Sequence, residues 1–77
     1  MNYTSEQKRL AYEIADALND HEAMKVHLEF AQRYQESFLR RILAKVMSIP
    51  EDKIRKSRGA LYTSLVKQHG GSSGAWD

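Results

Sequence analysis

Cysteine is absent from this chain of 77 residues, which excludes a disulfide framework and a thiolate metal site within it. A chain of this length lies near the lower limit at which a domain folds without such covalent or metal support. Its apolar runs are a few residues long, against roughly 20 for a membrane-spanning helix, and no charged start followed by an apolar run indicates a signal peptide. We therefore expect a cytoplasmic protein that binds no membrane and no metal and depends on packed helices for its stability.

Proline and glycine, the residues that interrupt helices, are also scarce. The one proline is Pro50, and of the four glycines only Gly59 precedes residue 70. The composition, 42% hydrophobic and 29% charged, is too apolar for a disordered chain. We predict an all-α fold, a compact bundle of three to five short helices over residues 1–69, followed by a flexible Gly/Ser-rich tail over residues 70–77.

Two start signals mark the first half of the chain. Thr4 followed by Gln7 is a capping-box pattern, in which the two side chains satisfy free amides at a helix start. Asn19 with Glu22 has the same form, so we expect a first helix that ends near Asn19 and a second that begins after it. The buried face of the first helix is predicted from apolar residues at helical spacing, Leu10, Ile14, Ala17 and Leu18.

The next apolar stripe runs without glycine or proline from Met24 to Met47. One continuous helix over residues 21–48 would be about 42 Å long, and a domain of this size could not cover both of its ends. We therefore predict a break at residues 34–36 and two shorter helices. Pro50 ends the second of them, because proline disfavours a helical residue before it and donates no amide hydrogen bond.

The last long helix is expected to begin at Ser57, which is a favourable N-cap residue. Before it, Pro50 and the two acidic residues that follow predict a short helix. We expect the last helix to end at Gly70, which we place in a left-handed cap conformation. Its buried face is predicted from four apolar residues, Leu61, Tyr62, Leu65 and Val66.

Charge divides the chain into two halves of opposite sign. Residues 1–36 hold four Lys or Arg and seven Asp or Glu, a net charge of −3, whereas residues 37–77 hold eight and three, a net charge of +5. The whole chain therefore has a formal charge of only +2. Such a distribution directs one end of a small domain toward polyanions, while the other end repels them.

Cations are densest around the predicted helix start at Ser57. Free backbone amides at a helix N-terminus bind phosphate, and the small residue Gly59 permits a close approach. On the preceding helix, further cations lie off the apolar stripe and extend the positive surface. The candidate nucleic-acid site contains Arg40, Arg41, Lys45, Lys53, Arg55, Lys56, Ser57, Arg58 and Gly59. The alternative is a solvated basic face that binds no ligand.

Two stretches of the basic half resemble parts of DNA-associated families. Residues 57–62, Ser-Arg-Gly-Ala-Leu-Tyr, look like the start of the recognition helix in TetR-type helix-turn-helix repressors, but that family has a short helix and a glycine turn upstream that this chain lacks. Residues 54–69 are similar to C-terminal helical segments of plasmid and phage replication proteins. The second resemblance implies a role near replicating DNA in a mobile genetic element, and it assigns no function to individual residues.

Other chemically capable residues favour structural roles. His21 and His27 are six positions apart, about 240° around a helix, so they cannot converge on a metal ion. Glu13 has Arg9 one turn before it and is expected to pair with that cation. The ring of Tyr62, which could stack on a base, lies in an apolar stripe and is expected in the core. Because no Ser/His/Asp set, glycine-rich phosphate loop or reactive thiol points to catalysis, we expect no enzyme and no cofactor.

The tail carries a large aromatic residue on a Gly/Ser tether. Trp76, next to Asp77, could dock into a groove of a partner protein, or it could belong to an end without a binding role.

These features predict a small non-enzymatic accessory protein that binds nucleic acid, DNA in preference to RNA, in the replication or regulation of a mobile genetic element. The alternative is a protein-interaction module or homodimeric adaptor, in which the acidic first helix meets a basic surface of its partner.

Overall fold

Residues 3–70 are described by a computed structural model, and they form four α-helices and two short 3₁₀-helices. In chain order the elements are α1 (Ser5–Leu18), η1 (His21–Ala23), α2 (Met24–Arg33), α3 (Glu36–Met47), η2 (Glu51–Lys53) and α4 (Arg58–Gly70). The described residues contain no strand, and the Cα radius of gyration of 12.0 Å is close to the roughly 11 Å expected of a compact domain of this length. The predicted all-α bundle is confirmed. Of the tail predicted over residues 70–77, Gly70 belongs to α4, and residues 71–77 lie outside the described residues.

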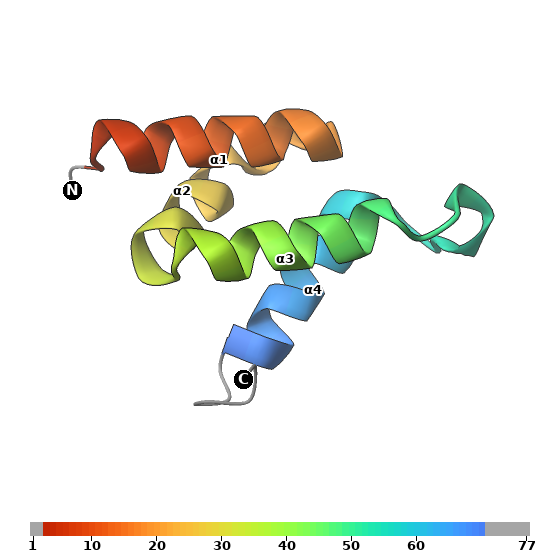
Figure 1. Cartoon of the computed structure of the whole chain (residues 1–77). Helices are drawn as coiled ribbons and strands as arrows, with labels where there is room; N and C mark the ends of the chain where they lie inside the picture. The colour runs from red at the N-terminus through yellow and green to blue at the C-terminus, as the bar shows by residue number, and fades with distance from the viewer. Residues whose placement is uncertain (1–2, 71–77) are drawn as a thin grey trace.

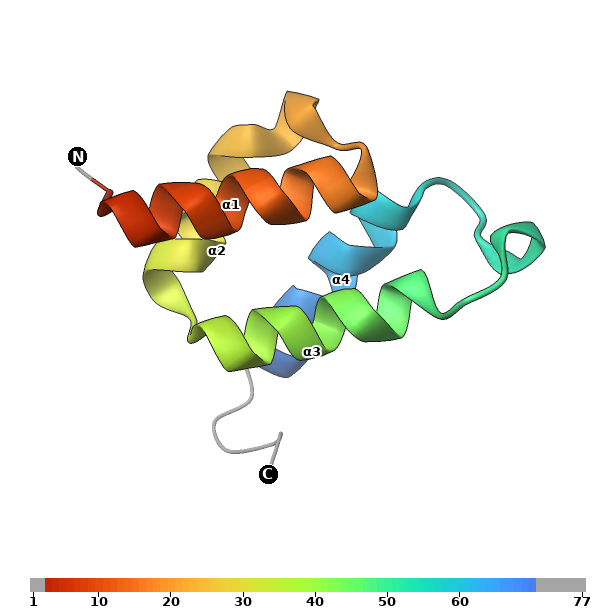
Figure 2. The same ribbon diagram turned by 45° about the horizontal axis from the view of Figure 1, so that its top comes forward.

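The helices are arranged so that the connection between α3 and α4 stands at one end of the bundle. Figure 1 shows α1 and α3 running in the same direction, with α2 returning behind them and α4 crossing behind α3. α1 packs mainly on α2, and α4 packs mainly on α3. In Figure 2 the connection, which includes η2, extends away from the four helices. Most residues of the connection are exposed, and Ile54 is half-buried.

The start of α1 has the local structure that its sequence predicts. The amide of Gln7 donates to Oγ1 of Thr4 at 3.0 Å, and the amide of Thr4 donates to Oε1 of Gln7 at 2.9 Å. This reciprocal pair is a complete capping box, in which two otherwise free amides are satisfied. The predicted first start signal is confirmed.

Asn19 ends α1 and does not cap the next helix, so the second predicted start signal, Asn19 with Glu22, is wrong. Its φ of 53° and ψ of 49° are left-handed, and its amide donates to the carbonyls of Ala15 and Asp16. Asparagine adopts this conformation more readily than most non-glycine residues, which explains the stop. η1 follows, and α2 then begins at Met24 without a side-chain cap.

The predicted interruption of the central apolar stripe is present. α2 ends at Arg33, Tyr34 is extended with φ −114° and ψ 158°, and α3 begins at Glu36. The short helix predicted after Pro50 is also present, as the three-residue η2. Sequence patterns therefore located both changes of chain direction that separate α2, α3 and α4.

Gly70 is the last residue of α4 and not a left-handed cap beyond the helix, so its predicted conformation is wrong. A Cβ atom added to Gly70 would lie 2.5 Å from Cε1 of Tyr34. Glycine at this position therefore lets the Tyr34 ring close against the end of α4. The reason for this glycine is a close tertiary contact and not a turn.

All four α-helices contribute to one apolar core. Tyr62 and Val66 of α4, both 0% exposed, lie among buried side chains of the other three helices, which confirms the core position predicted for Tyr62. Its ring centroid is 5.6 Å from that of His27 and 6.3 Å from that of Phe30. The buried apolar residues are Leu10, Ala11, Ile14, Ala15, Leu18, Phe30, Ala31, Leu39, Ile42, Val46, Tyr62 and Val66.

We predict that Tyr62→Phe raises the free energy of unfolding by up to about 1 kcal/mol, measured by urea denaturation. The Tyr62 hydroxyl is buried and has no hydrogen-bond partner among residues 3–70, and burial also raises the pKa of this phenol. An unsatisfied buried polar atom lowers stability, and phenylalanine removes it while keeping the ring. As the control, Tyr62→Ala removes the ring and should lower the free energy of unfolding by about 3–5 kcal/mol. A clear loss of stability in Tyr62→Phe would show that the hydroxyl contributes favourably.

Candidate nucleic-acid interface

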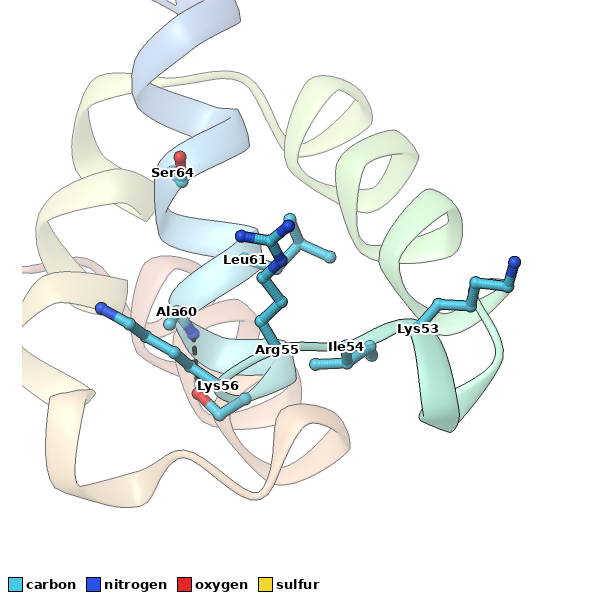
Figure 3. Close-up of a pocket in the computed structure, with 8 residues that line it drawn as sticks. Lys53, Ile54, Arg55, Lys56, Ala60, Leu61 and Ser64 are labelled. Carbon is cyan, nitrogen blue, oxygen red and sulfur yellow. Dashed lines mark hydrogen bonds between the residues drawn. The ribbon is translucent and has the colours of Figure 1, made fainter.

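Three of the predicted cations lie together on the connection between α3 and α4. Lys53, Arg55 and Lys56 are exposed, and all three line one open hollow of about 480 Å³. One wall of the hollow is the connection and the other is the first turns of α4 (Figure 3). The complete lining is Lys53, Ile54, Arg55, Lys56, Ser57, Ala60, Leu61 and Ser64. We call this feature the basic hollow.

The cations of the basic hollow form a row and do not converge on one point. In Figure 3, Arg55 extends along the start of α4 beside Leu61, whereas Lys53 and Lys56 extend to opposite sides. A single small anion could not contact all three side chains in this arrangement. A row of separated charges instead suits an extended polyanion, whose phosphates are spaced along a chain.

Ser57 caps α4 as the sequence predicts and remains exposed. Its Oγ accepts a hydrogen bond from the amide of Ala60 at 3.0 Å, and its carbonyl accepts one from the amide of Leu61 at 3.1 Å. Part of the amide row at this helix start is therefore already satisfied by the cap. The binding capacity of the basic hollow lies chiefly in its cationic side chains.

Gly59 is buried and does not face a ligand. A Cβ atom at this position would lie 2.5 Å from Cγ of Asp20 and within 2.8 Å of both carboxylate oxygens. The Asp20 carboxylate also lies 3.0 Å from Nε2 of His27, which is 2% exposed. The close approach predicted for Gly59 is therefore made by a carboxylate of the protein itself.

The contact between Asp20, His27 and Gly59 was missed by the sequence analysis. It joins the segment after α1 to the start of α4, and no local spacing signals a contact between segments so far apart in the chain. The lack of a side chain at Gly59, in the first turn of α4, is the only trace of it in the sequence.

Arg58 is half-buried and already has a partner. Its guanidinium donates to the carbonyl of Val46 at 2.7 Å, near the C-terminal end of α3. A cation at this position satisfies a carbonyl at the helix end and interacts favourably with the negative end of the helix dipole. Arg58 therefore serves to hold the end of α3 against the start of α4.

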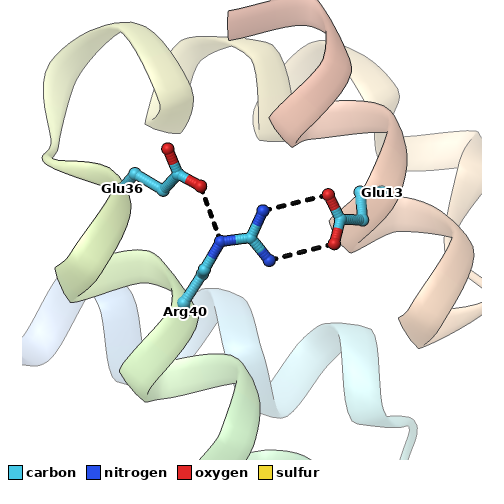
Figure 4. A network of polar contacts seen from close by, with 3 residues as sticks. All are labelled: Glu13, Glu36 and Arg40. Carbon is cyan, nitrogen blue, oxygen red and sulfur yellow. Dashed lines mark hydrogen bonds and ion pairs between the residues drawn. The ribbon is translucent and has the colours of Figure 1, made fainter. Parts of the chain in front are cut away.

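Arg40 is engaged in a network between α1 and α3, shown in Figure 4. Its guanidinium donates twice to Glu13, at 3.0 Å for each bond, and its Nε donates to Glu36 at 2.6 Å. The predicted pairing of Glu13 with Arg9 is thus replaced by a bidentate pair with Arg40, and Arg9 acts on Glu13 only through its charge. Arg40 belongs to a contact between two helices and not to the basic hollow.

Hydrogen bonding to Arg40 lowers the pKa of Glu13 below its usual range. The pKa of Arg40 is raised, first by its bond to Glu13 and then by its bond to Glu36. A carboxylate with a lowered pKa stabilises the folded state at pH values above the pKa that the group has in the unfolded chain. This stabilisation is lost as the pH falls through the pKa of the group in the folded protein. Since these side chains are exposed, solvent and salt screen the interaction.

Arg41 and Lys45 are exposed on α3 and are not part of the lining of the basic hollow. They are four positions apart and so share one side of the helix. Lys45 is five positions from Arg40, about 140° around the helix axis, which places these two cations on different sides of α3. The nine predicted residues therefore divide into those of the hollow, those of α3 and those used to hold the fold together.

No family model, curated protein or solved structure matches this chain. The resemblances of residues 57–62 and 54–69 thus stay predictions from short motifs. Among residues 3–70, no His, Asp and Glu side chains are grouped in a way that could hold a metal ion, and no helix has the length and apolar character needed to cross a bilayer. The proposed partner-binding residues Trp76 and Asp77 lie outside the described part of the chain.

We predict that Gly59→Ala lowers the free energy of unfolding by about 1–3 kcal/mol. At an ordinary helix position, replacing glycine by alanine stabilises the protein by about 1 kcal/mol. A loss of stability at residue 59 would therefore show that the added methyl group has no room. Here the new methyl group would displace Asp20 from Gly59 and from His27. Urea denaturation of Gly59→Ala, Asp20→Ala and the double variant measures the coupling. In the double variant the methyl group at residue 59 should be tolerated, because the shortened side chain at residue 20 leaves room for it. Additive losses of stability would show that the two positions do not interact.

Proposed function

We propose that this protein is a non-enzymatic accessory protein that binds nucleic acid through the basic hollow. The observation that carries the proposal is the grouping of exposed Lys53, Arg55 and Lys56 around one hollow next to the exposed cap residue Ser57. Such contacts to phosphates hold the backbone of a nucleic acid without reading its sequence. Arg41 and Lys45 supply additional positive charge on α3.

The acidic half of the chain supports the proposal by restricting the orientation of binding. Exposed carboxylates lie on α1, η1 and α2, and they repel a polyanion from that part of the domain. The basic hollow lies between the first turns of α4 and the connection, which extends from the bundle (Figure 2). One side of the domain is therefore suited to the ligand. On these elements the exposed carboxylates are Glu6, Glu13, Asp16, Glu22 and Glu29, of which Glu13 is paired with Arg40, and on the connection Glu51 and Asp52 are exposed as well.

DNA is proposed in preference to RNA, and a mobile genetic element as the setting, because residues 54–69 resemble segments of plasmid and phage replication proteins. The structure-based part of the proposal does not depend on that resemblance. That part depends only on the charge and the exposure of the hollow, and these would favour the binding of any polyanionic strand.

We predict that the triple variant Lys53→Gln, Arg55→Gln, Lys56→Gln binds labelled DNA at least tenfold more weakly at low salt, measured by fluorescence anisotropy. Three phosphate contacts release about three counterions, so the slope of log affinity against log salt should become less steep by about 2.7. The charge-matched control replaces three exposed cations of the acidic half, Lys8, Lys25 and Arg33, by glutamine and should leave both quantities nearly unchanged. Failure of the unmodified protein to bind any nucleic acid at low salt would reject the proposal.

A second candidate function is protein association, favoured by the surface around Tyr12. This side chain is 61% exposed and, with Arg9, Glu13 and Asp16, lines a shallow hollow of about 430 Å³ on α1. Tyrosine is enriched in protein interfaces, and an exposed aromatic residue beside carboxylates is suited to a basic partner. In a homodimer, this surface of one copy would meet the basic hollow of the second.

For the homodimer we expect light scattering to show association at low salt that weakens as salt is added, because its contacts would be ionic. Replacing the exposed ring by Tyr12→Ser should weaken association, and Gln32→Ser, an exposed position on α2, is the control. A monomeric mass at every protein and salt concentration would contradict this candidate.

A further inference from the structure

The basic hollow has an apolar floor as well as a cationic rim. Ile54, Ala60 and Leu61 line it together with the cations, and Ile54 and Leu61 are only half-buried. The volume of this open hollow is about 480 Å³. Contacts to backbone phosphates alone do not need apolar residues, since phosphates are bound by cationic side chains, hydroxyl groups and backbone amides.

The wall of the hollow formed by α4 is suited to a planar group. Ala60 and Ser64 are one helical turn apart and exposed, and both side chains are small. Figure 3 shows Arg55 extending along this part of α4 beside Leu61. A guanidinium is itself planar and stacks on nucleobases, so Arg55 can cover a ring that rests on the small residues. The Ser64 hydroxyl, which lies 3.5 Å from the side-chain amide of Gln68, stands at the upper end of the wall.

We propose that the basic hollow binds one unpaired base of a single strand, with the adjoining phosphates contacting Lys53 and Lys56. This inference rests on the proposed function and specifies its substrate class. A base in a duplex is stacked on both sides and cannot enter the hollow, whereas an unpaired base is free to do so. Single-strand binding of this type would be tolerant of sequence, because every base presents an apolar face.

The test compares two single strands of equal length and charge with a duplex and an acidic peptide, by anisotropy at one salt concentration. The probes are a single-stranded oligothymidylate, a single strand of the same length made of abasic sites, a duplex and a polyglutamate peptide. Stacking of a base contributes enough for the oligothymidylate to bind about five to a hundred times more tightly than the abasic strand. The bases of the duplex are stacked and paired, so its affinity should depend on its charge alone and should not change in variants that affect only base binding.

Two variants separate base binding from phosphate binding. Arg55→Lys keeps the charge and removes the planar group, and Ser64→Leu places a bulky side chain at the exposed wall. Each should reduce the advantage of the oligothymidylate over the abasic strand toward one. Ser64→Leu keeps all three cations of the hollow and should therefore leave the affinity for the abasic strand and the salt slope nearly unchanged. Ser37→Leu, an exposed serine on α3, is the matched control for Ser64→Leu. Urea denaturation verifies that all variants remain folded.

The outcomes distinguish this inference from the function on which it rests. Tight and equal binding of the oligothymidylate and the abasic strand would overturn the unpaired-base proposal and leave nucleic-acid binding in place. Unchanged base preference in both Arg55→Lys and Ser64→Leu would overturn the assignment to this hollow. Competition by polyglutamate as effective as that by oligothymidylate would overturn both proposals in favour of an acidic protein partner.

Discussion

The location of the basic hollow depends on how the start of α4 is held against the rest of the domain. Two consecutive residues make this attachment. Gly59 admits the carboxylate of Asp20, which is paired with the buried His27, and Arg58 donates to the carbonyl of Val46 at the end of α3. The inner side of the helix start is thus used for the fold. Its outer side, together with the connection before it, is left available to a ligand.

Local sequence patterns were sufficient for most of the architecture. The capping box at Thr4 and the cap at Ser57 depend on residues three positions apart, and chemistry at that range is visible in the sequence. The break near Tyr34 was predicted instead from the length that one continuous helix would have. The two errors have different origins. Asparagine favours both a helix start and a left-handed helix end, so the sequence around Asn19 is ambiguous, whereas Gly70 is explained by the Tyr34 ring, which only the folded chain brings to it.

The candidate site was only partly predictable for the same reason. Arg40 is withdrawn from it by Glu13, which lies 27 positions away, and Arg58 by Val46, which lies 12 positions away. Neither partner can be assigned from charge density along the chain. Lys53, Arg55 and Lys56 remained exposed because they lie on a connection, and connections run over the surface where their backbone groups are solvated. A cluster of cations in a sequence therefore overstates the charge that a fold presents to a ligand.

The extended connection also affects the susceptibility of the protein to proteolysis. Exposed loops are preferred cleavage sites, and trypsin cuts after lysine and arginine. Lys53, Arg55 and Lys56 are such residues, and Ile54 between them has the extended backbone that a protease active site requires, with φ −93° and ψ 121°. Cleavage there would separate α4 from the three helices whose core it completes. A ligand bound in the basic hollow would cover these same peptide bonds. Ligand binding should therefore protect the connection from cleavage.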